Sequence, residues 1–268
     1  MSTAFTQPHR WKRPPLVANP WLRWGLYLGG LVYLAAALST LDVNWERIGE
    51  GLSQGARFLE GFLVPDFTTR SRDIWRGMEE SLTMTVTSTV VGCLISVPIG
   101  LGAARNIAPL PVYAVCRAII ALSRAFQEVI IAILFVAMFG FGPFAGFLTL
   151  SFATIGFMAK LLAEDIEDIN EAQAEAIRAT GANWWQVINY GIQPQVLPRL
   201  IGLSLYRLDI NFRESAVIGI VGAGGIGATL NTAMQRYDYD TAGAILIMII
   251  LIVLAAEYAS SHLRKWVQ

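Results

Sequence analysis

The sequence predicts an all-α membrane protein, a polytopic bundle of about six transmembrane helices. Of its 268 residues, 54% are hydrophobic and only 15% are charged, and the mean hydropathy is +0.50. This composition is too apolar for an ordinary soluble domain and is typical of a single membrane unit. The formal net charge is zero. No overall field therefore attracts nucleic acid, and we expect a lipid bilayer rather than nucleic acid as a partner.

Six apolar blocks are each long enough to cross a bilayer. Polar or glycine-rich connections separate these blocks, which span residues 21–41, 81–104, 112–140, 143–162, 197–221 and 241–259. The first block lacks a small-residue cleavage pattern, so we expect an uncleaved helix after the basic tail. The second is rich in Ser, Thr and Gly, which predicts close packing inside the bundle, and Pro98 is expected to kink it.

The connection between the first two blocks, residues 42–78, is polar and carries mixed charges. It contains an amphipathic patch that is expected to lie on the bilayer surface, formed by Phe58, Leu59, Phe62 and Leu63. We therefore divide the chain into a basic tail, residues 1–20, a first transmembrane helix with a periplasmic connection, 21–78, and a main transmembrane domain, 79–265.

Lys and Arg near the span ends predict the orientation, because these residues concentrate on the cytoplasmic side of a membrane. They occur in the N-terminal tail and at Arg105, Arg117, Lys160, Arg178, Arg199, Arg264 and Lys265. With six spans, all of these positions fall on one face, so both chain ends are expected in the cytoplasm. Five arginines between residues 42 and 78 oppose this orientation, but that connection is longer and its charges alternate with acids.

A polar segment with strong helix propensity separates the fourth apolar block from the fifth. Good helix formers precede Gly181, which is placed to end a helix with a positive φ. Asn183 and Gln186 form a capping-box pattern that starts a second short helix. Pro194 and Pro198 are expected to stop that helix. The segment is therefore predicted to be two short helices joined at Gly181, either a partner-binding elbow or an ordinary surface connection.

The spacing of Glu175-Ala176, Gly181 and Pro194 resembles the EAA loop of bacterial ABC-importer membrane subunits. In that family the loop is a cytoplasmic coupling helix that docks in a groove of an ATPase subunit. The resemblance implies a coupling loop at residues 171–198 and the MetI-like fold of a type I ABC importer permease. It assigns ATPase coupling to Glu175, Ala176, Gly181, Ala182 and Pro194. Gly191 departs from the pattern, since many members carry Ile or Val there.

Longer strings narrow the resemblance to the membrane subunit of phosphonate importers (PhnE-like), over roughly residues 75–265. The strings are SLYRLDINFRESAVIGIVGAGGIG, EAIRATGANWWQVINYGIQPQVLP and FGFGPFAG. The resemblance implies a permease of the bacterial inner membrane that carries phosphonate or a related phosphorus oxyanion such as phosphite. The phosphorus chemistry comes from this resemblance alone. A methionine-type or other small-solute importer of the same architecture is the alternative.

The same resemblance implies a set of partners. These are two ATP-binding-cassette ATPase subunits, a second permease copy or paralogue, and a periplasmic substrate-binding protein. ATP and Mg would be bound by the ATPase subunits, so no cofactor or metal is expected in this chain.

The string GAGGIG, Gly222–Gly227, matches the dinucleotide-binding pattern GxGxxG. That fingerprint requires a preceding strand in a soluble βαβ unit, whereas here it follows an apolar membrane block. We therefore interpret the cluster as permitting tight turns and close backbone packing near the mouth of the translocation path.

Ionisable residues inside the predicted spans are costly and mark candidate functional positions. They are Arg124, Glu128, Arg207, Asp209, Arg213 and Glu214. Arg124 and Glu128 are four residues apart, as are Asp209 and Arg213, so each pair could neutralise itself on one helix face. Two interpretations remain open. The residues form ion pairs that fix bundle packing, or the arginines line the translocation path and offer donors to an anion.

A membrane-embedded enzyme is the hypothesis from another class, and the residues give it little support. The two histidines, His9 and His262, lie in or near the tails, and no Ser or Cys has a readable base. The chain also lacks a Gly-Lys-Ser/Thr phosphate loop, so ATP hydrolysis is expected to come from a partner. A structural or receptor-type membrane protein would not need the capped elbow at Gly181.

Overall fold

The computed structural model describes residues 17, 19–40 and 45–267, which form helices and turns with no strand among them. The chain divides into two compact units, residues 1–54 and 55–268, which are considered separately. The all-α fold expected from the composition is confirmed.

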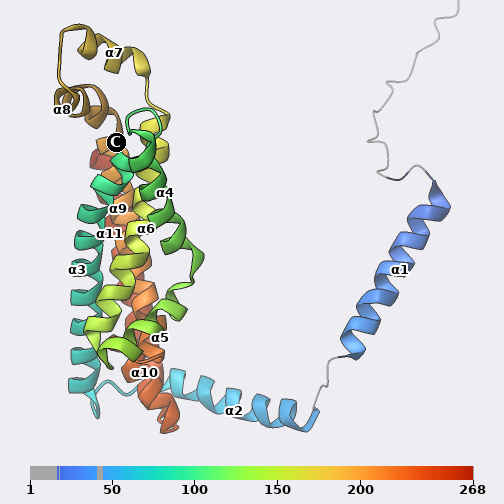
Figure 1. Cartoon of the computed structure of the whole chain (residues 1–268). Helices are drawn as coiled ribbons and strands as arrows, with labels where there is room; N and C mark the ends of the chain where they lie inside the picture. Colours follow the sequence, from blue (N-terminus) through green and yellow to red (C-terminus); the bar gives the residue numbers. More distant parts are fainter. Residues whose placement is uncertain (1–16, 18, 41–44, 268) are drawn as a thin grey trace, which may run out of the picture. The chain divides into compact units, whose positions relative to one another are not determined.

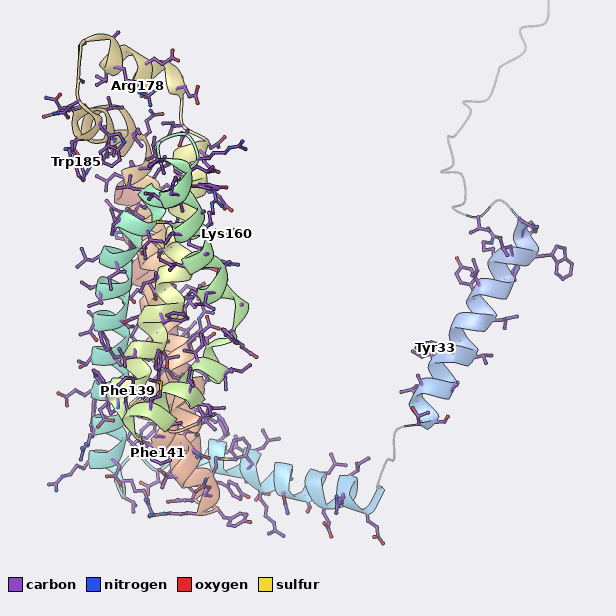
Figure 2. The ribbon with its side chains drawn as sticks, in the orientation of Figure 1. Tyr33, Phe139, Phe141, Lys160, Arg178 and Trp185 are labelled. Carbon is purple, nitrogen blue, oxygen red and sulfur yellow. The ribbon has the colours of Figure 1, made fainter. Side chains whose placement is uncertain are left out.

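The first unit contains one long apolar helix, α1, Pro20–Ser39. Asn19 caps it, because the Asn19 side-chain oxygen accepts a hydrogen bond from the Trp21 backbone N–H at 3.0 Å. Within this unit the Leu, Trp and Tyr side chains of α1 are exposed, and Tyr33 projects outward in Figure 2. A 20-residue apolar helix matches the thickness of a bilayer core. The first predicted helix is therefore present, although its expected end at residue 41 lies outside the described residues.

The second unit is a bundle of long helices that run side by side (Figure 1). The long helices are α3, Ser71–Ala103, α6, Pro143–Glu167, α9, Gln193–Ile220, and α11, Tyr239–Val267. The bundle also contains α4, Leu110–Ala125, and α5, Glu128–Phe139. At one end lie α7, Glu171–Ala179, α8, Trp184–Gln186, and a π-helix, Val187–Ile192. The opposite end holds α10, Gly225–Gln235.

Five helical segments of the described chain are long and apolar enough to cross a membrane, or six when α4 and α5 count as one bent span. The second count agrees with the six predicted blocks. The block at 112–140 was expected to be one helix, but α4 and α5 meet at an angle of 93°. Phe126 and Gln127 have extended backbone and interrupt the helix. The prediction that Arg124 and Glu128 share one helix face is therefore wrong, because they lie on different helices.

The second apolar block also begins earlier than expected, since α3 starts at Ser71. Asp66 orders the turn before this helix, and its Oδ1 accepts hydrogen bonds from the backbone N–H groups of Thr68 at 2.8 Å and Thr69 at 3.2 Å. The Thr68 hydroxyl donates to the same oxygen at 2.7 Å. These bonds favour the ionised carboxylate, so the Thr68 side chain first, and its neighbours after it, hold the pKa of Asp66 well below its usual range. Pro98 lies inside α3 without ending it, and the expected kink there stays a prediction.

Small residues let α3 pack closely along α6, as their abundance predicted. The buried small residues of α3 include Ser81, Ser88, Gly92, Ser96 and Gly100. A β-carbon added at Gly92 would lie 2.6 Å from the Thr154 Cβ of α6, well inside a normal contact distance. Buried hydroxyls bond within their own helix, as where Thr89 donates to the Thr85 carbonyl at 2.7 Å. The two backbones therefore approach closely with the Thr89 hydroxyl paired, whereas the buried hydroxyls of Thr85 and Ser151 have no hydrogen-bond partner among the described residues.

The amphipathic patch in the first connection belongs to α2, Trp45–Leu63, and its aromatic half packs against the start of α11. The Phe58 ring contacts the Tyr239 ring at a centroid distance of 5.8 Å, and Phe62 packs edge-on against Phe58 at 5.2 Å. Leu59 and Leu63 remain exposed. Their expected position on the bilayer surface stays a prediction.

The elbow of α7 and α8 and the end of α11 lie at the same end of the second unit (Figure 1). Arg178 and Trp185 mark this end in Figure 2, whereas Phe139 and Phe141 lie at the opposite end. The orientation of this end toward the cytoplasm stays a prediction. The N-terminal tail lies outside the described residues, so its side stays a prediction.

Replacing Gly92 with Ala should destabilise the bundle, because the new methyl group would collide with Thr154. Overpacking a well-packed core typically costs about 1–3 kcal/mol, so we expect a lower melting temperature in detergent. Gly202 is the matched control, since a β-carbon there meets nothing within 4 Å and Gly202→Ala should leave melting unchanged or raise it. Equal melting of the two variants would show that the α3–α6 contact does not need a glycine.

Candidate functional site

Gly181 forms the turn of the elbow in a conformation that suits glycine. Its φ is +81°, and its backbone N–H donates to the Arg178 carbonyl at 3.0 Å. A β-carbon at Gly181 would meet nothing within 4 Å, so the backbone angle alone favours glycine there. The predicted positive φ is confirmed.

The second half of the elbow starts with the predicted capping box. The Asn183 side-chain oxygen accepts from the Gln186 backbone N–H at 2.9 Å, and the Gln186 side chain accepts from the Asn183 backbone N–H at 2.8 Å. The chain then continues through the π-helix directly into α9. Pro194 lies in the first turn of α9, where its missing N–H is tolerated. The expectation that Pro194 and Pro198 stop the second helix is wrong, because the helical run from Trp184 continues through both of them.

The elbow has an inner face that is fixed to the bundle. Val187, Ile188 and Ile192 are buried in one apolar cluster that also contains residues of α6, namely Leu162, Ala163 and Ile166. Gly191 is buried as well, and a β-carbon there would lie 3.1 Å from the Ala174 Cα. The glycine that departs from the family pattern thus lets the π-helix lie directly against α7.

The outer face of the elbow is open. Glu175, Ala176 and Pro194 are exposed, and so are the aromatic side chains of Trp185 and Tyr190. Of the five predicted coupling residues, Ala182 is half-buried and Gly181 forms the exposed turn. The elbow therefore presents polar, small and aromatic groups outward while its aliphatic residues hold it to the bundle.

Ion pairs connect the elbow end of α6 to two neighbouring helices. Arg117 of α4 contacts Glu167 at 2.8 Å, and the Arg117 Nε donates to the Ala103 carbonyl of α3 at 2.9 Å. Arg199 of α9 contacts Asp165 at 3.1 Å. Because α6 leads into α7 and the π-helix leads into α9, these pairs connect both sides of the elbow to the bundle.

A second feature is a cavity of about 380 Å³ at the break between α4 and α5. Its polar lining comes from Ser123, Arg124, Gln127, Glu128 and Arg207. Arg207 is only 3% exposed, and its Nη2 lies 3.7 Å from the Glu128 Oε1. No hydrogen-bond partner meets this Nη2 among the described residues. The cavity therefore contains a buried cation with one donor group unused.

A polar network holds the Arg207 side chain in place. The Arg207 Nε donates to the Thr154 hydroxyl oxygen at 3.1 Å, and the guanidinium carbon lies 5.4 Å from the centre of the Phe157 ring. The Asn211 side-chain amide donates to the same Thr154 oxygen at 2.9 Å and to the Thr89 hydroxyl at 2.8 Å. The network joins α3, α6 and α9 across the middle of the bundle.

The six charged candidates separate into two groups. Arg124, Glu128 and Arg207 line the cavity together. Arg213 forms its predicted ion pair with Asp209 and is half-exposed, while Glu214 is half-buried, and neither Asp209, Arg213 nor Glu214 lines this cavity. The sequence did not indicate Thr89, Thr154 or Asn211, because single polar residues in apolar blocks carry no pairing signal. The one available sign was the position of Asn211, four residues after Arg207 on the same helix.

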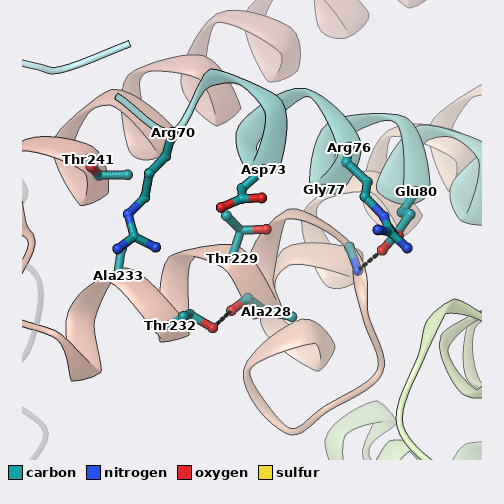
Figure 3. Close-up of a pocket in the computed structure, with 11 residues that line it drawn as sticks. Arg70, Asp73, Arg76, Gly77, Glu80, Ala228, Thr229, Thr232, Ala233 and Thr241 are labelled. Carbon is teal, nitrogen blue, oxygen red and sulfur yellow. Dashed lines mark hydrogen bonds and ion pairs between the residues drawn. The ribbon is translucent and has the colours of Figure 1, made fainter. Parts of the chain in front are cut away.

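A further cavity, of about 230 Å³, lies between the start of α3 and α10 (Figure 3). Arg70 and Asp73 reach from α3 toward α10 in this view. Arg70 is paired with Asp238 at 3.0 Å and Arg76 with Glu80 at 3.1 Å. The Arg70–Asp238 pair joins the start of α3 to the turn after α10, whereas the Arg76–Glu80 pair lies within α3. Most of the charges that line this cavity are therefore neutralised.

The glycine cluster Gly222–Gly227, at the α10 end of the bundle, forms tight turns and packs closely, as predicted. Gly222, Gly224 and Gly225 all have positive φ, which makes the turn between α9 and α10. The Glu80 carboxylate accepts from the Gly225 backbone N–H at 3.2 Å, and the Ser81 hydroxyl accepts from that of Ile226 at 2.9 Å. In a dinucleotide site a phosphate would accept from such groups. Here α3 supplies the acceptors, so the cluster serves helix packing.

Relatives of this chain are transport permeases. The phosphate-import permease protein PhnE of Mycolicibacterium smegmatis is 41% identical over 242 residues, which cover 90% of this chain. This chain spans only 45% of that protein's length. The phosphite transport system permease protein PtxC of Stutzerimonas stutzeri is 38% identical over 252 residues, which cover 91% of this chain and 90% of that protein.

The fold has a counterpart among solved structures. An inward-facing conformation of the MetNI methionine ABC transporter includes a chain that is 25% identical, with a TM-score of 0.61. The match covers 74% of this chain and 95% of that one. This likeness confirms the predicted MetI-like architecture.

The family assignment rests on more than these individual relatives. The family model for the inner membrane component of binding-protein-dependent transport systems matches residues 96–267, which include the elbow and the cavity. With its apolar spans, the chain is an integral membrane protein. It belongs to the family of inner membrane components of binding-protein-dependent transport systems.

Proposed function

We propose that this chain is the permease subunit of an ABC importer that carries phosphonate or a related phosphorus oxyanion, such as phosphite, across the bacterial inner membrane. Membership of the transport family carries the proposal. Relatives that cover about nine-tenths of the chain are named as phosphate-import and phosphite transport permeases, which favours a phosphorus oxyanion. The buried guanidinium of Arg207 suits an anionic cargo.

The proposed assembly contains two ATP-binding-cassette ATPase subunits, a second permease copy or paralogue, and a periplasmic substrate-binding protein. ATP and Mg would bind to the ATPase subunits. The elbow would face the cytoplasm together with both chain ends. A solved transporter that matches this chain at 17% identity and a TM-score of 0.60 is described in complex with a substrate-bound periplasmic protein. That level of likeness supports the fold, and the partner is inferred from the family name.

In the proposed mechanism, closure of the ATPase subunits displaces the elbow, and the helices rock between outward-open and inward-open arrangements. Glu175, Ala176, Gly181, Ala182 and Pro194 would couple the ATPase to this motion. The inner-face packing of the elbow supports the assignment, because a displaced elbow must move α6 and α9 with it. The charged candidates of the translocation path are Arg124, Glu128, Arg207, Asp209, Arg213 and Glu214. The strongest candidates are Arg124, Glu128 and Arg207, which line the same cavity.

A methionine-type importer is the second candidate, and the likeness to the MetNI transporter favours it. Methionine also carries a carboxylate, so a buried arginine does not distinguish the two cargoes. The sequence identities of 38% and 41% with the phosphorus-anion permeases exceed the 25% identity with the MetNI chain. We therefore place the phosphorus oxyanion first.

Vesicles that hold this chain, its ATPase and its binding protein should take up phosphite or a phosphonate only when ATP is present. Excess methionine should leave this uptake unchanged. The measurement is accumulation of labelled anion with and without ATP, with a hydrolysis-deficient ATPase as control. Inhibition by methionine, or active ATPase without phosphorus uptake, would keep the permease and reject the phosphorus cargo.

Gly181→Val should lower transport while the protein still inserts and assembles, because valine is strained at a φ of +81°. A left-handed conformation costs an ordinary residue about 1–2 kcal/mol, which corresponds to about a tenfold change in an equilibrium between elbow conformations. Gly181→Asn is the matched control, since Asn adopts positive φ more readily. Uptake and ATPase stimulation are the readouts. Full uptake by the Val variant, or equal loss in both variants, would contradict a role for the backbone angle.

A further inference from the structure

The cavity at the α4–α5 break contains a resident carboxylate beside its buried cation. Glu128 is the first residue of α5, and its side chain is 29% exposed against 4% for the Arg207 side chain. Their closest atoms are 3.7 Å apart, which is an ion pair but exceeds hydrogen-bond distance. The Nη2 of Arg207 faces this carboxylate and has no hydrogen-bond partner among the described residues. Glu128 therefore neutralises the charge of Arg207 but leaves its Nη2 without a hydrogen bond.

The two partners differ in how firmly they are held. Arg207 is fixed through its Nε by Thr154, and Asn211 holds Thr154 in turn. The Glu128 carboxylate is held less firmly, since its one ion pair among the described residues is with Arg207. A change at this site would therefore move the carboxylate and leave the guanidinium in place.

Other groups around the cavity can also bind an anion. Arg124 lines the cavity and makes no ion pair among the described residues. The N-terminus of the 12-residue helix α5 opens at the same point, and its N-cap, Gln127, provides no side-chain hydrogen bond. The first N–H groups of a helix lack intrahelical acceptors and attract anions. The volume of about 380 Å³ exceeds the roughly 30 Å³ share of one water many times, so a tetrahedral oxyanion fits.

The charges at the site set what it can accept. Arg124 and Arg207 carry two positive charges and Glu128 one negative charge, so these lining residues contribute a net charge of +1. A buried arginine that loses its counter-ion would be strongly destabilised. An anion that replaces Glu128 at Arg207 would keep the guanidinium neutralised.

We propose that a tetrahedral oxyanion crosses this site by ion-pair exchange, in which it displaces the Glu128 carboxylate from Arg207 and is later displaced by it. The anion gains the unused Nη2 donor, Arg124 and the N-terminus of α5. The return of Glu128 to Arg207 then releases the anion without leaving a bare cation. This inference rests on the proposed function, and it assigns Glu128 a competing role rather than a structural one.

Glu128→Gln tests the exchange, because glutamine keeps the shape of the side chain and removes its charge. The assembled transporter, purified without binding protein, is melted over a range of phosphite and, separately, inorganic phosphate concentrations. Phosphite should stabilise the Gln variant at about tenfold lower concentration than the wild type, because the neutral amide of glutamine competes with the anion for Arg207 less strongly than the carboxylate does. Maximal ATP-dependent uptake should fall in the same variant, because release is slowed.

Two further variants make the result decisive. Glu79→Gln removes an exposed glutamate of α3 and should leave the anion dependence unchanged. The double variant Glu128→Gln with Arg207→Gln keeps the local charge balanced, so it should fold and lose the stabilisation by both anions. This variant separates loss of the site from simple misfolding.

The outcomes also separate this inference from the proposed function. Anion-dependent melting that is equal in the wild type and in Glu128→Gln, or absent from both, would overturn the exchange. Wild-type vesicles that fail to import phosphite or phosphonate would overturn the cargo. In that case stronger stabilisation of Glu128→Gln by phosphate would still support the exchange for another oxyanion.

Discussion

The buried guanidinium of Arg207 is the constraint on which the centre of this bundle depends. A cation that is 3% exposed among apolar helices requires compensation, because desolvation opposes the charged form. Thr154 accepts from its Nε, Phe157 faces its plane and Glu128 supplies the opposite charge. Thr154 and Phe157 belong to α6 and Glu128 belongs to α5, so one side chain of α9 links the packing of α5, α6 and α9. The break before Glu128 is what allows a carboxylate to reach this depth.

The elbow is packed against the bundle on one face and exposed on the other. Val187, Ile188 and Ile192 are held by burial, whereas Glu175 and the aromatic residues beyond Gly181 are exposed. Burial of aliphatic groups transmits displacement efficiently because close-packed interiors compress little. An elbow held only by polar surface contacts would slip against the bundle. In the proposed coupling, the apolar inner face therefore matters as much as the exposed residues that would touch a partner.

Local rules predicted much of this architecture. Apolar blocks located the long helices, and the capping box at Asn183 and the turn at Gly181 followed from residue identity alone. The sequence-based predictions failed where tertiary contacts determine the local structure. The interruption after Ala125 has no proline or glycine to announce it, and Pro198 lies inside a helix that continues through it. Glu128 pairs with Arg207 and not with Arg124, because the 93° bend between α4 and α5 separates Glu128 from Arg124. Spacing along a chain cannot reveal such a partner.

Helix α4 connects the elbow end of α6 to the cavity. Arg117 binds Glu167 near the end of α6, and Arg124 lies at the cavity seven residues later on the same helix. With 16 residues, α4 is about 24 Å long and behaves as a short rigid lever. A shift of α6 at the elbow would therefore pull α4 and change the geometry of the break where Glu128 begins α5. Since Arg207 is anchored on α9 and Glu128 follows α4, relative motion of these helices acts on the distance between the two charges. The ion pair that neutralises the site is thus also placed to sense the elbow.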